Sequence, residues 1–78
     1  VEILMDDLQY LPSSINIERG MTVRWVNLDD VPHTVNSQTF DSGVIEPGGH
    51  FDFRFDETGV HVYVCALHPE MRGVITVD

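Results

Sequence analysis

The sequence contains no lysine, one cysteine and no long hydrophobic run. Four arginines stand against 13 acidic residues, and the formal net charge of −9 at pH 7 opposes binding to nucleic acid phosphates or anionic lipid. The lone Cys65 excludes an internal disulfide. No apolar stretch approaches the roughly 20 residues that a membrane-spanning helix needs. We therefore expect a soluble chain that binds neither nucleic acid nor membrane. We also expect the Cys65 thiol to have a role other than disulfide formation.

The short length of the chain limits the number of domains and the size of the core. At 78 residues the chain is expected to be a single domain, residues 1–78, with a small core. It has neither an initiator methionine nor a leader-like segment, so we expect a mature product or an excised domain. The carboxylates could steer a basic partner, but they form no dense block, which favours a simple role in solubility. We interpret the acidic pairs Asp6-Asp7, Asp29-Asp30 and Asp56-Glu57 as solvated turns rather than recognition sites.

Short strands separated by turn residues dominate the pattern, and no segment predicts a helix. Apolar and charged residues alternate strictly from Phe51 to Asp56, which is the signature of a strand with one buried face. The segment from Met21 to Asn27 places Val23, Trp25 and Asn27 on one face, with Trp25 as a core residue.

The run from Val60 to Cys65 is β-branched or aromatic on both faces, which predicts a central strand covered on each side. Seven or eight short strands at this spacing predict an all-β sandwich. The weaker strand patterns lie at Val1–Met5, Ser14–Ile17, His33–Asn36 and Val74–Val77.

Three potential metal donors follow the strongest strand within seven residues. Cys65, His68 and Met71 recur at every third position in the order Cys-Ala-Leu-His-Pro-Glu-Met. Pro69 and the β-rich flanks favour a loop between two strands over a helix. A loop can fold its donors around one point, so these three side chains are candidates for a shared metal.

A fourth donor, His33, lies in Val31-Pro32-His33-Thr34-Val35, some thirty residues upstream. Two imidazoles, one thiolate and a weak axial thioether form the donor set of copper electron-transfer sites and match copper better than zinc. Four protein donors leave no open position for a substrate, which favours electron transfer over catalysis. We read His50 and His61 as residues that face solvent or pack locally, and Met5 and Met21 as core or edge residues.

On these motifs the chain resembles the cupredoxin family, in particular its plastocyanin and amicyanin branch. The resemblance implies a Greek-key sandwich of seven to eight strands with one type 1 blue copper ion at one end. It also implies electron transfer between a donor and an acceptor protein, a monomer, a periplasmic or extracytoplasmic location, and exit of the electron through His68. The family's elements appear in order as Val31–Val35, Phe40–Gly43, Pro47–Gly49, Tyr63–Cys65 and Ala66–Met71 with Gly73, and the implied docking patch comprises Val31, Pro32, Leu67, Pro69 and Pro47.

One position departs from the family. The residue after the first ligand histidine is often asparagine there and is Thr34 here. We expect its backbone N–H still to bond the Cys65 sulfur.

Other functions compete with the electron carrier. The same donors could hold Cu(I) for delivery or storage, and the chain could be the copper domain of a larger oxidase or reductase. A cysteine hydrolase would also place a histidine near Cys65. The sequence offers that mechanism no orienting group and gives Met71 no part in it. The spacing therefore favours copper, with His33, Cys65, His68 and Met71 as ligands.

Overall fold

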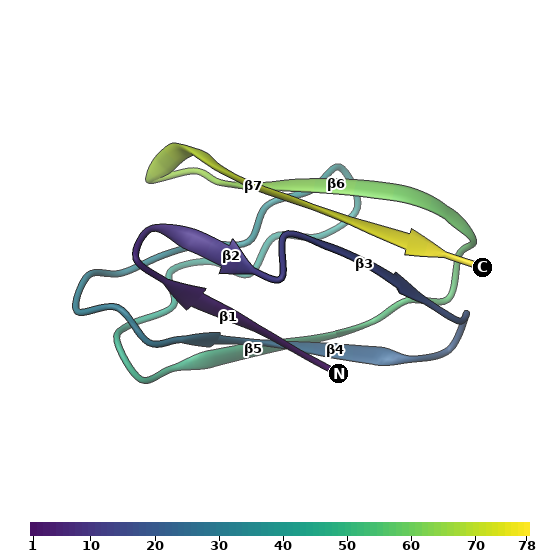
Figure 1. Cartoon of the computed structure of the whole chain (residues 1–78), viewed down its shortest axis with the longest axis horizontal. Coiled ribbons are helices and arrows are strands. Elements are labelled where there is room, and N and C mark those ends of the chain that lie inside the picture. Colours follow the sequence, from purple (N-terminus) through teal and green to yellow (C-terminus); the bar gives the residue numbers. More distant parts are fainter.

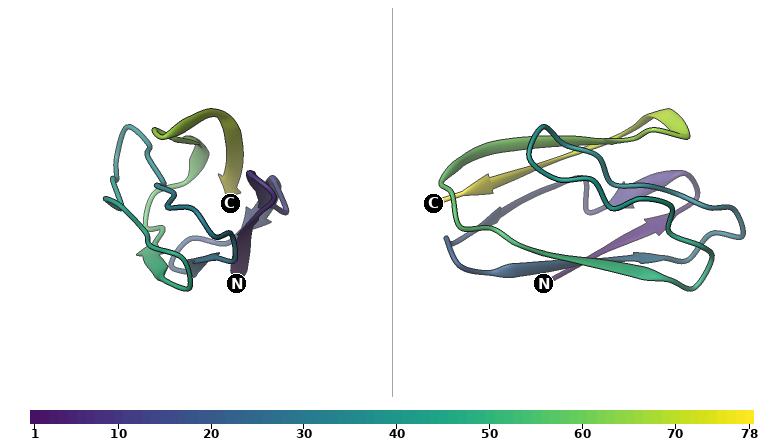
Figure 2. Two further views of the ribbon diagram at one scale, coloured as in Figure 1. Left: turned by 90° about the vertical axis from the view of Figure 1, so that its left-hand side faces the viewer. Right: turned by 180° about the vertical axis from the view of Figure 1, so that it is seen from behind.

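The chain folds as two β-sheets packed face to face, with no helix (Figures 1 and 2). The structure is a computed structural model that describes all 78 residues. It confirms the predicted all-β sandwich, with seven strands, and it contains no helix that could span a membrane. The strands are β1 (Glu2–Asp6), β2 (Gln9–Leu11), β3 (Ser14–Ile17), β4 (Thr22–Asn27), β5 (His50–Arg54), β6 (Gly59–Cys65) and β7 (His68–Val77).

One sheet has the order β2-β1-β4-β5 and the other β3-β7-β6. β1 lies parallel to β4 and β3 lies parallel to β7, whereas the remaining pairs are antiparallel. The chain crosses between the sheets after β2, after β3 and after β5. These crossings bring residues that are far apart in the sequence to the same end of the sandwich, where the turn between β6 and β7 lies (left in Figure 1).

Alternation along β4 builds the centre of the core as predicted. Val23, Trp25 and Asn27 are fully buried, while the residues between them face outward. Trp25 packs against Tyr63 of the opposite sheet, with ring centroids 5.4 Å apart. The predicted strand at residues 51–56 is confirmed over its first part, because β5 ends at Arg54 and Phe55 follows it as a buried core residue.

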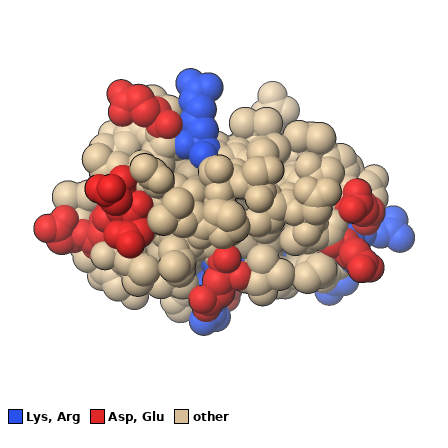
Figure 3. Space-filling model, viewed as in Figure 1, with Lys and Arg blue, Asp and Glu red and all other residues tan.

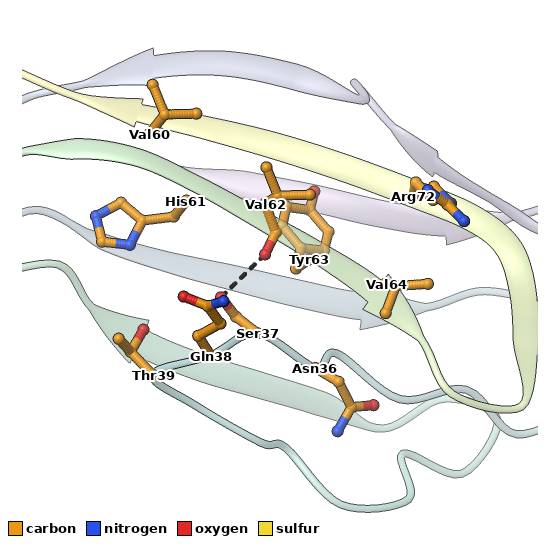
Figure 4. Close-up of a pocket in the computed structure, with 10 residues that line it drawn as sticks. All are labelled: Asn36, Ser37, Gln38, Thr39, Val60, His61, Val62, Tyr63, Val64 and Arg72. Carbon is orange, nitrogen blue, oxygen red and sulfur yellow. Dashed lines mark hydrogen bonds between the residues drawn. The ribbon is translucent and has the colours of Figure 1, made fainter.

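The prediction of a covered central strand at Val60–Cys65 is wrong. β6 lies at the edge of its sheet, and Val60 and Val62 are 67% and 61% exposed. No third layer covers the outer face of this sheet. The valines there favour the strand conformation because they are β-branched, and they do not form a core. Figure 4 shows the groove beside this strand, where Ser37 Oγ donates a hydrogen bond to the Val62 carbonyl at 3.0 Å.

The segment from residue 28 to residue 49 contains no regular strand, which corrects the weak strand prediction at His33–Asn36. Isolated bridges hold it instead. His33 pairs with Ile45 within the segment, and Asn36 pairs with Val64 of β6. This irregular segment closes the sandwich beside β6 and carries His33 into the interior, where its side chain is fully buried.

Candidate metal centre

Three donor side chains converge at the end of the sandwich where β6 turns into β7. Cys65 is the last residue of β6, His68 is the first of β7, and His33 reaches them from the segment between β4 and β5. Cys65 Sγ lies 3.8 Å from His33 Nδ1 and 3.8 Å from His68 Nδ1. All three donor atoms lie within 4.8 Å of one another. The structure thus brings together three of the four predicted ligands from two distant stretches of the chain.

The spacing of these atoms fits a bound metal ion. First-row metals lie about 2.3 Å from a thiolate and about 2.0 Å from an imidazole nitrogen. A trigonal angle would then separate sulfur from nitrogen by about 3.7 Å, and a tetrahedral angle by about 3.5 Å. The two separations of 3.8 Å lie close to both values, so one metal ion could contact all three donors. Two imidazoles and a thiolate in one plane are typical of copper electron-transfer sites.

A tight turn, not the predicted loop, joins Cys65 to His68. These two residues face each other in the β6–β7 ladder, with Ala66 and Leu67 forming the turn between them. The Ala66 N–H donates to Thr34 Oγ1 at 2.8 Å, so the turn is tied to the segment that carries His33. The ladder therefore fixes both donors on rigid backbone.

Met71 occupies a bulge in β7. Val64 pairs with Arg72 and Cys65 pairs with His68, so residues 69–71 of β7 have no opposite residue on β6. Pro69 lacks an N–H and cannot take part as a donor in a ladder there. The extra residues end with Met71 facing inward, 2% exposed. Its burial leaves the thioether away from solvent, and its role as a ligand stays a prediction.

The environment of Cys65 favours the thiolate. Burial raises the pKa of this thiol, but hydrogen bonds to the sulfur, of which the one from the Thr34 N–H is the strongest, outweigh burial and lower the pKa to about 6. The Thr34 N–H lies 3.4 Å from the sulfur, which confirms the expected contact. The thiolate is the form that binds metal, so the apoprotein already holds the sulfur close to its ligand state.

The second nitrogen of His33 is also engaged. His33 Nε2 lies 2.7 Å from Asp29 Oδ2, and this contact directs Nδ1 of the same ring toward Cys65. Asn27, which is fully buried, holds the intervening loop by donating to the carbonyls of Val31 and Ile45 at 2.9 and 3.0 Å.

His68 lies nearer to solvent than His33. Its side chain is half-buried, whereas that of His33 is inaccessible. The five residues of the predicted docking patch are all exposed: Val31, Pro32, Pro47, Leu67 and Pro69. Figure 3 shows carboxylates at the left end of the view, which in Figure 1 holds the β1–β2 and β6–β7 turns, and further carboxylates at the right end and along the lower edge.

The sequence predicts three side chains that the structure brings together, but it does not predict the groups that support them. We interpreted Asp29-Asp30 as a solvated turn, which is wrong for Asp29, because its carboxylate contacts His33. The four-residue spacing between Asp29 and His33 was the available signal. His50 is exposed on β5, and His61 Nε2 lies 3.0 Å from the Glu57 carbonyl. Both stand outside the donor cluster, as expected.

Comparisons with known proteins agree with this geometry. The family model described as a cupredoxin-like domain matches residues 1–77. The chain is 29% identical over 85 residues to amicyanin from Paracoccus versutus, covering all of this chain and 64% of that protein. It is 33% identical to plastocyanin from Scenedesmus fuscus, covering 91% of this chain and 88% of that protein. The chain thus spans less than two thirds of the length of the first of these relatives.

Solved structures give the same result. A purple cupredoxin from Nitrosopumilus maritimus superposes with a TM-score of 0.94 at 32% identity, covering 100% of this chain and 99% of that one. An oxidized amicyanin variant superposes with a TM-score of 0.95 at 22% identity, covering 81% of that chain; this second likeness concerns the fold alone. With a family model that matches almost every residue and a Cys-His-His cluster at the end of a seven-stranded sandwich, the chain belongs to the cupredoxin-like family.

Proposed function

We propose that the chain is an electron carrier whose mononuclear type 1 copper centre is held by His33, Cys65, His68 and Met71. The observation that carries the proposal is the buried Cys65 sulfur, 3.8 Å from each of two imidazole nitrogens. Copper bound there would supply one reversible Cu(I)/Cu(II) couple between redox partners. Membership of the cupredoxin-like family, with amicyanin and plastocyanin among the relatives, supports this function.

The protein's own residues keep the donor arrangement similar in both oxidation states. Cys65 and His68 sit on a paired ladder, and His33 is held by backbone pairing with Ile45 and by its contact with Asp29. Fixed donors need little rearrangement when an electron arrives or leaves, and that makes transfer fast. Met71, buried beside the same ladder, is proposed as the weak fourth donor that closes the site to substrates. This arrangement suits a carrier rather than an enzyme.

Partner docking is proposed at the apolar surface around His68. The half-buried His68 ring is the ligand nearer to solvent, and Val31 and Leu67 beside it are 36% and 48% exposed. A small apolar contact allows brief complexes, while the surrounding carboxylates would meet basic residues of a donor or acceptor. We further propose that residues 1–78 form one domain, that the chain acts as a monomer, and that it works outside the cytoplasm, as the family resemblance implies.

Optical spectroscopy and voltammetry of the copper-loaded protein test this function. We expect an intense thiolate-to-Cu(II) charge-transfer band in the visible range and a reversible one-electron wave. Cys65→Ser should abolish the band, Met71→Leu should keep it and shift the potential, and the control His61→Ala should change neither. A Cu(II) form without the band would contradict the proposal. Loss of the metal on each redox cycle would instead favour the alternative, a module that stores or delivers Cu(I).

A further inference from the structure

We propose that Asp29 is the positioning residue for His33, and that the turn at Asp7 and Leu8 is shaped to hold the carboxylate of Asp29. The inference rests on the proposed metal centre, because it concerns how one of its ligands is oriented before metal arrives. The inference adds the turn of the β1–β2 hairpin to the groups that support the four proposed donors. In the sequence this turn looks like an ordinary acidic turn.

Three donors converge on this one carboxylate. His33 Nε2 lies 2.7 Å from Oδ2, the Leu8 N–H donates to Oδ2 at 3.0 Å, and the Asp7 N–H donates to Oδ1 at 2.7 Å. The Asp29 side chain is only 12% exposed. Hydrogen bonds to an ionised acceptor are shorter and stronger than neutral ones. The carboxylate therefore joins the ligand histidine directly to the β1–β2 hairpin.

The backbone of that hairpin is unusual. Asp7 and Leu8 have φ angles of 55° and 58°, so two successive non-glycine residues lie in the left-handed region, where leucine is rare. Two-residue turns of this shape are normally made by Asn-Gly or Asp-Gly. Leu8 gains little burial in exchange, since it remains 49% exposed.

The strained conformation has a use at this place. Successive N–H groups in such a turn point to one side and form a concave site for an anion. Here the anion is the carboxylate of Asp29, which is contacted by both of these N–H groups. The turn thus holds the carboxylate from outside the loop that carries it.

A second group fixes Asp29 from its own side. The Asp29 N–H donates to Asn27 Oδ1 at 2.9 Å, and the amide nitrogen of the same asparagine donates to the carbonyl of Ile45, the residue that pairs with His33. The carboxylate is therefore held between the hairpin and a buried loop. Because an ionised carboxylate can only accept, it selects the His33 tautomer that carries its proton on Nε2. The lone pair of Nδ1 is then left facing Cys65.

The test compares Asp29→Asn with Asp30→Asn, its exposed neighbour, in metal-free and copper-loaded protein. In the metal-free protein, at about pH 8 and above the ordinary imidazole pKa, nitrogen NMR should show a slowly exchanging proton on His33 Nε2. Asp29→Asn should lose that proton or exchange it rapidly, while Asp30→Asn should match the wild type. This readout does not depend on electron transfer, so it separates the inference from the proposed function.

In the copper-loaded protein, Asp29→Asn should weaken copper binding by about ten- to a hundredfold, the usual effect of removing a partner of a ligand histidine. It should also raise the reduction potential, because a neutral amide stabilises Cu(II) less than a carboxylate does. Leu8→Gly provides the complementary variant. It keeps the N–H and removes the strain, so it should raise the urea midpoint of the metal-free protein and leave the His33 signal unchanged.

Two results would overturn the inference. One is an Asp29→Asn variant with the same His33 proton exchange, copper affinity and potential as Asp30→Asn. The other is a Leu8→Gly variant that is less stable than the wild type, which would show that the left-handed turn carries no strain in need of an anion.

Discussion

Replacing Gly73 by alanine should destabilise the fold and disturb the metal end together. A Cβ atom at this position would lie 2.3 Å from both Cζ and Oη of Tyr63 and 2.7 Å from Cε2. Gly73 and Tyr63 face each other in the ladder between β7 and β6. Each is two residues from a proposed ligand, since Tyr63 precedes Cys65 and Gly73 follows Met71. The close contact between the Tyr63 ring and the Gly73 backbone thus helps to fix how β6 and β7 pair, and with it the positions of Cys65 and Met71.

The ring has little freedom to move away. Tyr63 is 1% exposed and is enclosed by Tyr10 and Trp25, whose ring centroids lie 4.6 and 5.4 Å from its own. Ordinary contact requires a shift of about 1 Å through a core packed at crystal-like density. Overpacking of this kind costs about 1–3 kcal/mol, and we expect the upper end, about 3 kcal/mol. A chain of this length has a total stability of about 4–12 kcal/mol.

Urea unfolding of the metal-free protein measures this cost. Tyr63→Leu removes the clashing ring, so the double variant Gly73→Ala/Tyr63→Leu should lose much less than the sum of the two single changes. In the copper-loaded protein, Gly73→Ala should also alter the charge-transfer band. A Gly73→Ala variant with the wild-type midpoint, or costs that simply add, would refute the packing argument.

Further predictions concern groups around the donors. Thr34→Val keeps the shape of the side chain but leaves the Ala66 N–H without its acceptor, so it should cost about 1–3 kcal/mol in urea unfolding; an unchanged midpoint would contradict this. The thiolate absorbance of Cys65 in the metal-free protein should titrate near its pKa of about 6, and a midpoint above about 8, the ordinary range, would be inconsistent with the hydrogen bonds described. Because folding lowers this pKa, the thiolate stabilises the metal-free protein fully above the pKa of the unfolded chain, and this stabilisation is lost as the pH falls to about 6. Cys65→Ser should abolish this dependence of stability on pH.

Much of the fold could be predicted because its signals are local. Strict alternation predicted β5, and the face shared by Val23, Trp25 and Asn27 is the buried face of β4. The burial of β6 could not be predicted in this way. Val60 and Val62 read as core residues, but whether a sheet face is covered depends on how many layers the whole chain supplies. This chain supplies two.

The site, like the fold, has parts that the sequence predicts and parts that depend on tertiary packing. Cys65, His68 and Met71 lie within one short motif, so their association is visible in the sequence. The contact between Asp29 and His33 depends on a loop held by Asn27 and on a hairpin of the first two strands. No short motif records that arrangement, because it arises from packing between segments that are separate in the chain. Groups that support a ligand are therefore harder to predict than the ligands.

Diffraction from copper-loaded crystals, measured on both sides of the copper absorption edge, tests the central claim most directly. We predict one copper peak per chain, bonded to His33 Nδ1, Cys65 Sγ and His68 Nδ1, with the Met71 sulfur as the next nearest donor. A peak at His50 or His61, or a structure in which these four side chains point away from one another, would contradict the account.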